Sequence, residues 1–289
     1  MTQRRSAGRT ARQPTALPTQ LDSYVLHSWD WSETSLIVEL LTRERGRLTV
    51  VARGAKRPTS QLRSVLLPFQ RIHVQLARAG AAEAADIHLL RTAEWQGGGP
   101  VLPPAALFQG FYVNELLMKL LPRHDAHSVL FEAYRLTLPA LAHGDELLAQ
   151  AGLRAFELVL LRDMGVLPDF TRSTLTQAAV LPAETYVLRA EAGLARATGE
   201  EPALPGQRWL DLHHALTGDS LRQLQEACVP VLQLLKPQLR HLIHHQLGSQ
   251  RLRTREVMQS VQRLMDTSVP GARAVAADRP LPDPQVHSP

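Results

Sequence analysis

The sequence is poor in cysteine: among its 289 residues there is one, Cys228. A single cysteine excludes an intramolecular disulfide, so nothing indicates an oxidising compartment. It also excludes a zinc site built on several cysteines, unless separate chains pool their ligands. Cys228 lies in the apolar segment EACVPVLQLL, which predicts a small buried side chain.

Long apolar runs are also missing. Segments such as SLIVELL and ELLMKLL are interrupted by charge well before the ~20 residues that a membrane-spanning helix needs. The opening residues contain Arg and Ser but no apolar core of the kind that a secretory signal requires. We therefore expect a cytoplasmic protein without a membrane partner.

Motifs for catalysis, cofactor binding and metal binding are absent as well. The segment GAKRPTS resembles a phosphate-binding loop but lacks two glycines at the required spacing. His241, His244 and His245 share one side of an expected helix, but no glutamate or third type of ligand accompanies them, which favours surface histidines. No catalytic residue, cofactor or metal is therefore predicted, and a nuclease or metalloenzyme is disfavoured. We expect a binding protein.

Aromatic residues make up only 5% of the chain. Between residues 21 and 93 they are Tyr24, Trp29, Trp31 and Phe69. Trp29 and Trp31 are two residues apart, which places them on one face of a strand and favours core packing for at least Trp31. Few bases can then stack on the protein, which suits a protein that binds a nucleic-acid backbone.

Positive charge is in excess near the N-terminus. Residues 1–20 hold four basic residues and no acid, residues 21–80 hold nine and five, and residues 81–289 hold 19 and 22. The entire net charge of +5 therefore originates in the first part of the chain. This asymmetry is typical of a polyanion-binding module joined to a more neutral domain, with nucleic acid the first candidate and an anionic membrane the second.

Residues 20–95 are divided by turn-type residues into short segments rich in Val, Ile and Leu. One segment, RIHVQL, alternates Ile72, Val74 and Leu76 with polar residues, as a half-buried strand does. Gly46 suits the turn between the second and third strands. Five short strands in about 70 residues predict a small closed barrel, of which the OB-fold is the commonest form; an SH3-like barrel also fits.

Helical periodicity follows a linker rich in Gly and Pro at residues 96–104. Apolar residues recur at i, i+3, i+4 and i+7 in three stripes, which predict three helices. The stripes are Val113, Leu116, Leu117, Leu120 and Leu121; then Leu130, Phe131, Tyr134, Leu138 and Leu141; then Leu153, Phe156, Leu160, Leu161 and Met164. Gly165 follows the third stripe, where a helix C-cap is expected.

The predicted fold class is mixed β and α, with an N-terminal OB-fold at 20–95 and a helical domain at 104–265. An irregular insertion at 168–208 interrupts the helical domain, and Gly193 suits the turn of a hairpin within it. Residues 1–19 and 268–289 lack periodicity and are predicted to be disordered tails.

The densest charge lies between Thr42 and Ser64, where seven basic residues accompany one acid. Arg and Lys on loops at one edge of a barrel can follow phosphates, and Gly54 lets backbone N–H groups approach an anion. A solvated edge that prevents aggregation is the alternative, but the basic tail favours nucleic acid. The predicted DNA-binding residues are Arg43, Arg45, Arg47, Arg53, Lys56, Arg57 and Arg63.

Several separated segments resemble the RecO family of bacterial recombination mediators. They are VLHSWDWSETSLIVELLTRERGRLTVVARGAKRPTSQL in the expected barrel, then FYVNELLMKLLPRHD, LRAFELVLLRDMGVLPDF and LGSQRLRTREV, in the family's order. The resemblance covers most of residues 21–265. It implies binding of single- and double-stranded DNA, annealing of complementary strands, and work with RecR to load RecA onto DNA coated by single-strand-binding protein. It also implies a nucleoid-associated protein without a nucleotide cofactor.

Two further expectations follow from the resemblance. Many family members carry paired cysteines after the LRxFE helix, whereas residues 168–208 contain none and Ser173 stands near the position of the first. We therefore predict no zinc and an insertion that is packed or mobile. The family also docks the acidic, apolar tail of single-strand-binding protein on its helical domain, and Leu153, Arg154 and Phe156 match that motif. An Arg154 paired with a neighbouring acid is the alternative.

A function of another class also fits the charge pattern. In this alternative the protein is a non-enzymatic interaction scaffold whose basic barrel edge binds acidic protein tails. Such a scaffold binds peptides but has no affinity for DNA at physiological salt.

Overall fold

The computed structural model describes residues 20–77, 87–97, 99–218, 220–254, 256–258 and 260. The tails expected at residues 1–19 and 268–289 lie outside this set. Among the described residues, no helix combines the length and the apolar character needed to cross a membrane.

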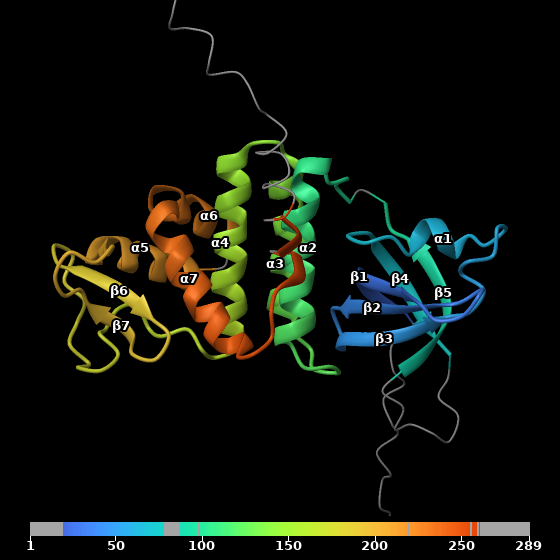
Figure 1. The fold of residues 1–289 in the computed structure, drawn as a ribbon, viewed down its shortest axis with the longest axis horizontal. Coiled ribbons are helices and arrows are strands. Elements are labelled where there is room, and N and C mark those ends of the chain that lie inside the picture. The colour runs from blue at the N-terminus through green and yellow to red at the C-terminus, as the bar shows by residue number, and fades with distance from the viewer. Residues whose placement is uncertain are drawn as a thin grey trace, which may run out of the picture. The chain divides into compact units, whose positions relative to one another are not determined.

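Five strands close into a barrel, drawn in blue to green-blue in Figure 1. They are β1 (Leu21–Asp30), β2 (Leu36–Thr42), β3 (Gly46–Ala52), β4 (Arg71–Leu76) and β5 (Ile87–Trp95), and the short helix α1 (Leu62–Val65) lies between β3 and β4. Their order around the barrel is β1-β2-β3-β5-β4, and only the β3–β5 pair is parallel. A closed five-stranded barrel fits the OB-fold, so the predicted β barrel is confirmed.

The barrel core follows from the alternation of side chains along the strands. In RIHVQL, Ile72 and Val74 are fully buried, as the sequence predicts, while Leu76 is only partly buried. Other strands contribute inward side chains without exposed surface, namely Val25, Val38, Leu40, Leu48 and Val50. The opposite face of each strand is left for the outer surface of the barrel.

The turn between β2 and β3 needs glycine for two reasons. Gly46 has φ +66°, in the left-handed region that side chains disfavour. In addition, a Cβ atom at this position would lie only 1.6 Å from the carbonyl oxygen of Asp125. The sequence predicts the turn, whereas the close approach of residue 125 arises only from the folded chain.

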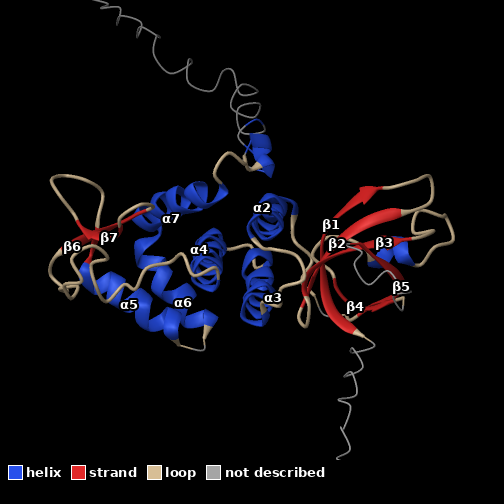
Figure 2. Cartoon of the chain, turned by 90° about the horizontal axis from the view of Figure 1, so that it is seen from below, coloured by secondary structure: helices blue, strands red, loops and turns tan. Residues whose placement is uncertain are grey.

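The helical part consists of α2 (Pro104–Leu120), α3 (Ser128–Ala142), α4 (Glu146–Asp163), α6 (Leu221–Cys228) and α7 (Leu232–Leu247). Helix α4 packs against α3, α6 and α7, and Figure 2 shows α2, α3 and α4 nearly end on. Cys228 is fully buried at the end of α6, as predicted, and burial raises the pKa of its thiol to about 12. A short 3₁₀ turn (Val229–Val231) contains Pro230, whereas Pro237 lies inside α7.

The three apolar stripes form the bundle core. Of the predicted residues, only Leu120 and Met164 are partly exposed; the others are buried. Helix α4 begins at an N-cap, Asp145, whose side chain accepts hydrogen bonds from the backbone N–H groups of Leu147 and Leu148. It ends at Asp163 with Met164 as its C-cap, one residue before the predicted Gly165, which follows with φ +72°.

The insertion is more regular than predicted. It contains a three-stranded sheet of β6 (Thr185–Arg189), β7 (Gly193–Arg196) and β8 (Leu204–Pro205), and the hairpin at Gly193 is present. Helix α5 (Gly206–Thr217) follows, and none of the three predicted apolar stripes covers it.

Packing holds this insertion in place. The rings of Phe170 and Trp209 are fully buried with their centroids 4.8 Å apart, and the indole N–H of Trp209 donates to the carbonyl oxygen of Tyr186. Of the two states expected for this segment, the packed one is therefore observed. The described residues contain no group of three or more His, Cys, Asp or Glu side chains arranged to hold a metal ion.

Candidate nucleic-acid interface

The seven predicted DNA-binding residues separate into two groups. The docking group, Arg43, Arg45 and Arg47, lies at the β2–β3 hairpin, and the pocket group, Arg53, Lys56, Arg57 and Arg63, lies after β3. The two groups differ in what surrounds each cation.

Arg47 belongs to the internal structure of the protein. Its side chain is only 13% exposed, and its Nη1 lies 2.5 Å from Oε1 of the fully buried Glu39 on β2. Its Nη2 donates to the carbonyl oxygen of Leu121 at the end of α2, 3.0 Å away. The same Glu39 accepts from the Thr49 hydroxyl at 2.7 Å and pairs with Arg123 at 3.5 Å. Arg47 therefore joins the barrel to α2, and its charge is already neutralised.

Arg43 and Arg45 are less enclosed. The guanidinium of Arg43 lies 3.1 Å from Glu132 of α3, and both side chains are partly exposed. Arg45 is half-buried and has no ion pair among the described residues. Its charge acts with burial and with His124 to lower the pKa of His88 on β5, burial being the largest cause.

The pocket group begins with a tight turn at Gly54, which has φ +71°. The backbone N–H of Arg57 donates to the Gly54 carbonyl at 3.1 Å, and the Arg57 side chain passes over the glycine. Arg53, Arg57 and Arg63 are exposed, and within the described chain none of them has an acidic partner. These three cations are available to an external anion.

Lys56 has a different position from its neighbours. Its Nζ lies 3.1 Å from the Asp30 carboxylate and donates to the Ser32 carbonyl at 3.2 Å. Its backbone N–H donates to the Thr34 carbonyl at 2.9 Å. Lys56 therefore fastens the β1–β2 loop, residues 31–35, to the turn after β3.

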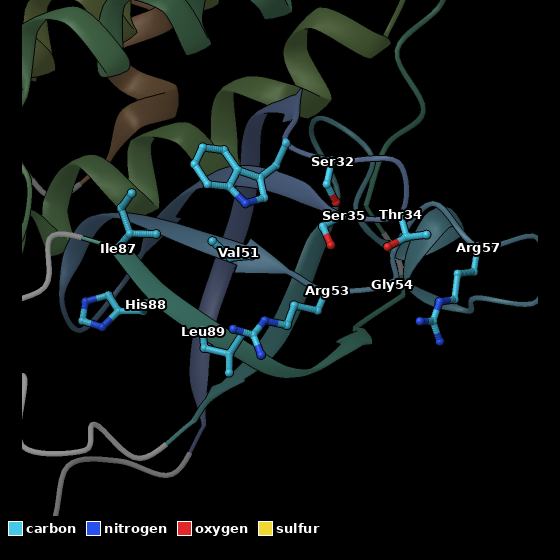
Figure 3. A pocket seen from close by; sticks show the side chains of 11 residues that line it. Ser32, Thr34, Ser35, Val51, Arg53, Gly54, Arg57, Ile87, His88 and Leu89 are labelled. Atoms are coloured by element: carbon cyan, nitrogen blue, oxygen red, sulfur yellow. The ribbon is translucent and has the colours of Figure 1, made fainter.

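A pocket of about 500 Å³ opens between the β1–β2 loop, the end of β3 and the start of β5. In Figure 3, Arg53 extends from the segment after β3 toward Leu89, and Arg57 lies beyond Gly54. The lining residues of the pocket are Trp31, Ser32, Thr34, Ser35, Val51, Arg53, Gly54, Arg57, Ile87, His88 and Leu89. The pocket joins an apolar surface to a basic rim.

The parallel pairing of β3 with β5 explains the apolar part of this surface. Val51 pairs with Leu89, and Ile87 pairs with Thr49. Because side chains alternate, Val51 and Arg53 share one face of their segment, as Ile87 and Leu89 share one face of β5. The neighbouring Val50 points into the barrel core and is fully buried. The pocket therefore lies on the outer face of the barrel.

The predicted core position of Trp31 is wrong. Strand β1 ends at Asp30, so Trp31 lies in the following loop, and 62% of it is exposed. Trp29 is 43% exposed and contacts the ring of His27. Strand β5 also extends to Trp95, which is 60% exposed. The barrel surface therefore offers more exposed aromatic side chains than the sequence pattern predicts.

The predicted tail-binding residues lie elsewhere, on α4. Leu153 and Phe156 are buried in the bundle core. Arg154 is 6% exposed at its side chain and lies 2.7 Å from Oε1 of Glu157, which also accepts a hydrogen bond from the Tyr112 hydroxyl. Burial raises the pKa of Glu157, while Arg154 and Tyr112 act to lower it. The structure thus pairs Arg154 with a neighbouring acid, and tail binding by these residues stays a prediction.

Comparison with known sequences matches both parts of this architecture. Residues 18–94 match the family described as "Recombination protein O N terminal", and residues 104–256 match "Recombination protein O C terminal". A protein of Polaromonas sp. named "DNA repair protein RecO" is 48% identical over 244 residues, which cover 84% of this chain and 96% of that protein. A protein of the same name from Verminephrobacter eiseniae is 47% identical over 246 residues, with the same coverage. The barrel and the helical domain that follows it therefore identify this chain as a member of the RecO family.

Proposed function

We propose that this chain acts in DNA repair by binding single- and double-stranded DNA on the outer face of its barrel. In this proposal it anneals complementary strands and, with RecR, helps to load RecA onto DNA coated by single-strand-binding protein. Membership of the RecO family and the name of the relatives support the DNA-repair role. Association with the nucleoid follows from the same proposal.

The observation that carries the proposal is the set of exposed cations without acidic partners beside the pocket. Arg53, Arg57 and Arg63 are exposed on one segment after β3, and Arg53 and Arg57 line the pocket. Arginine suits this role because its guanidinium stays charged and forms two parallel hydrogen bonds with a phosphate. Contacts to the backbone are independent of sequence, as a general repair function requires.

Annealing then needs no covalent chemistry. Two complementary strands repel each other through their phosphates, and cations on the protein reduce this repulsion while the bases pair. The residues of the barrel surface provide that charge, and no catalytic side chain takes part.

The partner tail is proposed to bind the helical domain near Arg154. A carboxylate arriving there competes with Glu157 for the guanidinium, so the tail must displace an existing ion pair. Lys236 is exposed on α7; partial burial lowers its pKa, and the positive charge of Arg154 lowers it further. A cationic side chain at the surface of α7 supports an approach of an acidic peptide from that side.

The test is a salt series with fluorescent single-stranded and duplex DNA. The double variant Arg53→Glu/Arg57→Glu should lose more than about tenfold in affinity at low salt, because two phosphate contacts become repulsive. The matched control, Arg208→Glu/Arg222→Glu, makes the same charge change on α5 and α6, remote in sequence from the barrel. Equal losses in both variants would leave the barrel without a specific role.

Binding of an acidic peptide but not of DNA by the native protein would establish the scaffold function instead.

A further inference from the structure

We propose that the barrel pocket holds an unstacked base of a single strand, with Trp31 as the stacking surface and Arg53 and Arg57 on the flanking phosphates. This inference rests on the proposed DNA binding and goes beyond it, because it assigns a contact to the base and predicts a preference between strands. The occupant is a nucleobase in a flexible, single-stranded chain.

The exposed apolar side chains of the pocket are the first support. Trp31, Ile87 and Leu89 all keep more than a third of their surface exposed, and they line the same pocket. Single exposed apolar residues are ordinary on a protein surface, but several around one hollow mark a binding site. A flat base face and the indole of Trp31 are complementary, since every base can stack on an aromatic ring.

The positive charge at the edge of the pocket favours a negatively charged ligand. Arg53 and Arg57 line the pocket beside its apolar surface, and neither has an acidic partner among the described residues. Figure 3 shows Arg53 beside Leu89, and Arg57 further along the same segment, beyond Gly54. A purely apolar ligand would gain nothing from contact with two cations. A nucleotide, in contrast, presents an apolar base face and a negatively charged phosphate side by side. The volume of about 500 Å³ lies within the range of roughly 300–1,000 Å³ typical of small-ligand sites.

The polar edge of the pocket tolerates different bases. The hydroxyl groups of Ser32 and Thr34 have no hydrogen-bond partner within the described chain, and both residues line the pocket. A hydroxyl either donates or accepts, so it can face the edge of any of the four bases. This edge gives the bound base a polar partner without reading the sequence.

The loop that presents Trp31 is held before any ligand arrives. The backbone N–H of Trp31 donates to the Ser35 carbonyl at 3.1 Å, which closes the loop on itself. Lys56 then ties the loop to the turn after β3 through Asp30, Ser32 and Thr34. We infer that Lys56 acts mainly as a positioning residue for the stacking surface. A pre-formed surface loses less conformational entropy on binding.

This arrangement discriminates between strands. Bases in a duplex are stacked and paired, and placing one in the pocket requires it to leave the helix at a cost. Single-stranded DNA offers bases that are already accessible. Removing the Trp31 ring should therefore weaken binding of single strands and leave the phosphate-driven binding of duplex DNA unchanged.

The experiment compares Trp31→Ala with Trp95→Ala in the full-length protein. Trp95 is similarly exposed on the same barrel but does not line the pocket. We expect Trp31→Ala to reduce affinity for a fluorescent single-stranded oligonucleotide about tenfold, and Trp31→Phe to retain most of it. Trp95→Ala should bind like the native protein. An abasic oligonucleotide of equal length and charge should bind the native protein as weakly as the normal oligonucleotide binds Trp31→Ala.

The outcomes separate this inference from the proposed function. If the native protein binds both kinds of DNA and Trp31→Ala matches it on single strands, the base pocket is wrong and DNA binding stands. An equal loss of affinity for single strands and duplex also overturns the pocket, because the role of Trp31 is then structural or directed at the backbone. If the native protein binds no DNA, both proposals fall. Circular dichroism of each variant verifies that the barrel is folded.

Discussion

The docking group and the pocket group lie less than one strand apart in sequence, yet the protein uses their charges in opposite ways. Arg47 is enclosed by Glu39 and the end of α2, and Arg43 is paired with Glu132 of α3. Arg53 and Arg57 have no acidic partner among the described residues. The density of positive charge in a segment therefore does not reveal its role, because the role depends on whether the fold places an acid opposite each cation.

The different surroundings of Arg47 and of the exposed Arg53 have a physical consequence. A guanidinium that is removed from water must recover its solvation through an ion pair and hydrogen bonds, as Arg47 does. An exposed guanidinium keeps its water and can exchange it for phosphate. Arg43 and Arg47 therefore contribute to the structure of the barrel–helix junction, whereas we propose that Arg53, Arg57 and Arg63 contribute to binding.

The largest effect is expected from Glu39→Ala. This change leaves the nearly buried Arg47 without its counter-charge and Thr49 without its acceptor. The loss of one partner of a buried pair typically costs about 3–5 kcal/mol, to be measured by urea unfolding. DNA affinity of the folded protein should not change. Glu33→Ala, in the exposed β1–β2 loop, is the control and should unfold like the native protein. Equal stability of both variants would contradict the structural role of this pair.

A smaller effect is expected from single removals of arginine. Arg53→Ala should decrease the slope of log affinity against log salt by about 0.7 for single-stranded DNA, as expected for one lost phosphate contact. Arg43→Ala should decrease it less, because Glu132 already occupies that guanidinium. Fluorescence anisotropy across a salt series measures both slopes. The division into two groups is wrong if the two slopes fall equally.

A substitution beside the docking group is expected to increase the affinity for DNA. Glu132→Gln releases Arg43 from its ion pair, and we expect a modest gain in DNA affinity, about threefold at low salt. Glu226→Gln on α6 removes the same charge from another exposed pair and serves as the control. A gain in the control of the same size would show that only net charge matters.

The smallest effect concerns pH. His88 lies between the two groups, and burial, Arg45 and His124 lower its pKa below the usual value in the free protein. Phosphates nearby favour the charged form, so DNA raises this pKa and binding takes up a proton. Affinity should therefore increase as the pH falls through the pKa of His88 in the complex. His88→Gln should show a smaller increase than the native protein when the two are titrated in parallel, and identical pH profiles would exclude this residue.

Local patterns predicted most of the fold. The alternation in RIHVQL and the helical stripes depend only on which face of an element is buried, so they indicated the barrel and three helices of the bundle. Helix α5 begins at the end of the insertion predicted at 168–208, and none of the three predicted apolar stripes covers it. Its apolar residues Trp209, Leu212 and Leu216 nevertheless have helical spacing and are buried.

The site was harder to predict because it depends on contacts between distant residues. The partners of Arg47 are eight and 74 positions away, and no periodicity indicates them. Trp31 was not predicted correctly because the face that it shares with Trp29 is exposed: Trp29 lies in β1 and is 43% exposed, and the strand ends at Asp30. Arg154 was assigned a binding role from its motif, although its acidic partner, Glu157, is one helical turn further along α4.

The buried thiol of Cys228 can report how often the helical bundle opens locally. The thiol has no exposed surface in the folded state, and a pKa raised to about 12 leaves almost no reactive thiolate at neutral pH. An alkylating reagent can therefore reach it only when α6 separates from the bundle, and the rate of alkylation measures how often that happens. The variant Ser32→Cys would carry a second, exposed thiol that reacts quickly and can be labelled with a dye beside the pocket. The buried thiol of Cys228 would remain unlabelled in the folded protein.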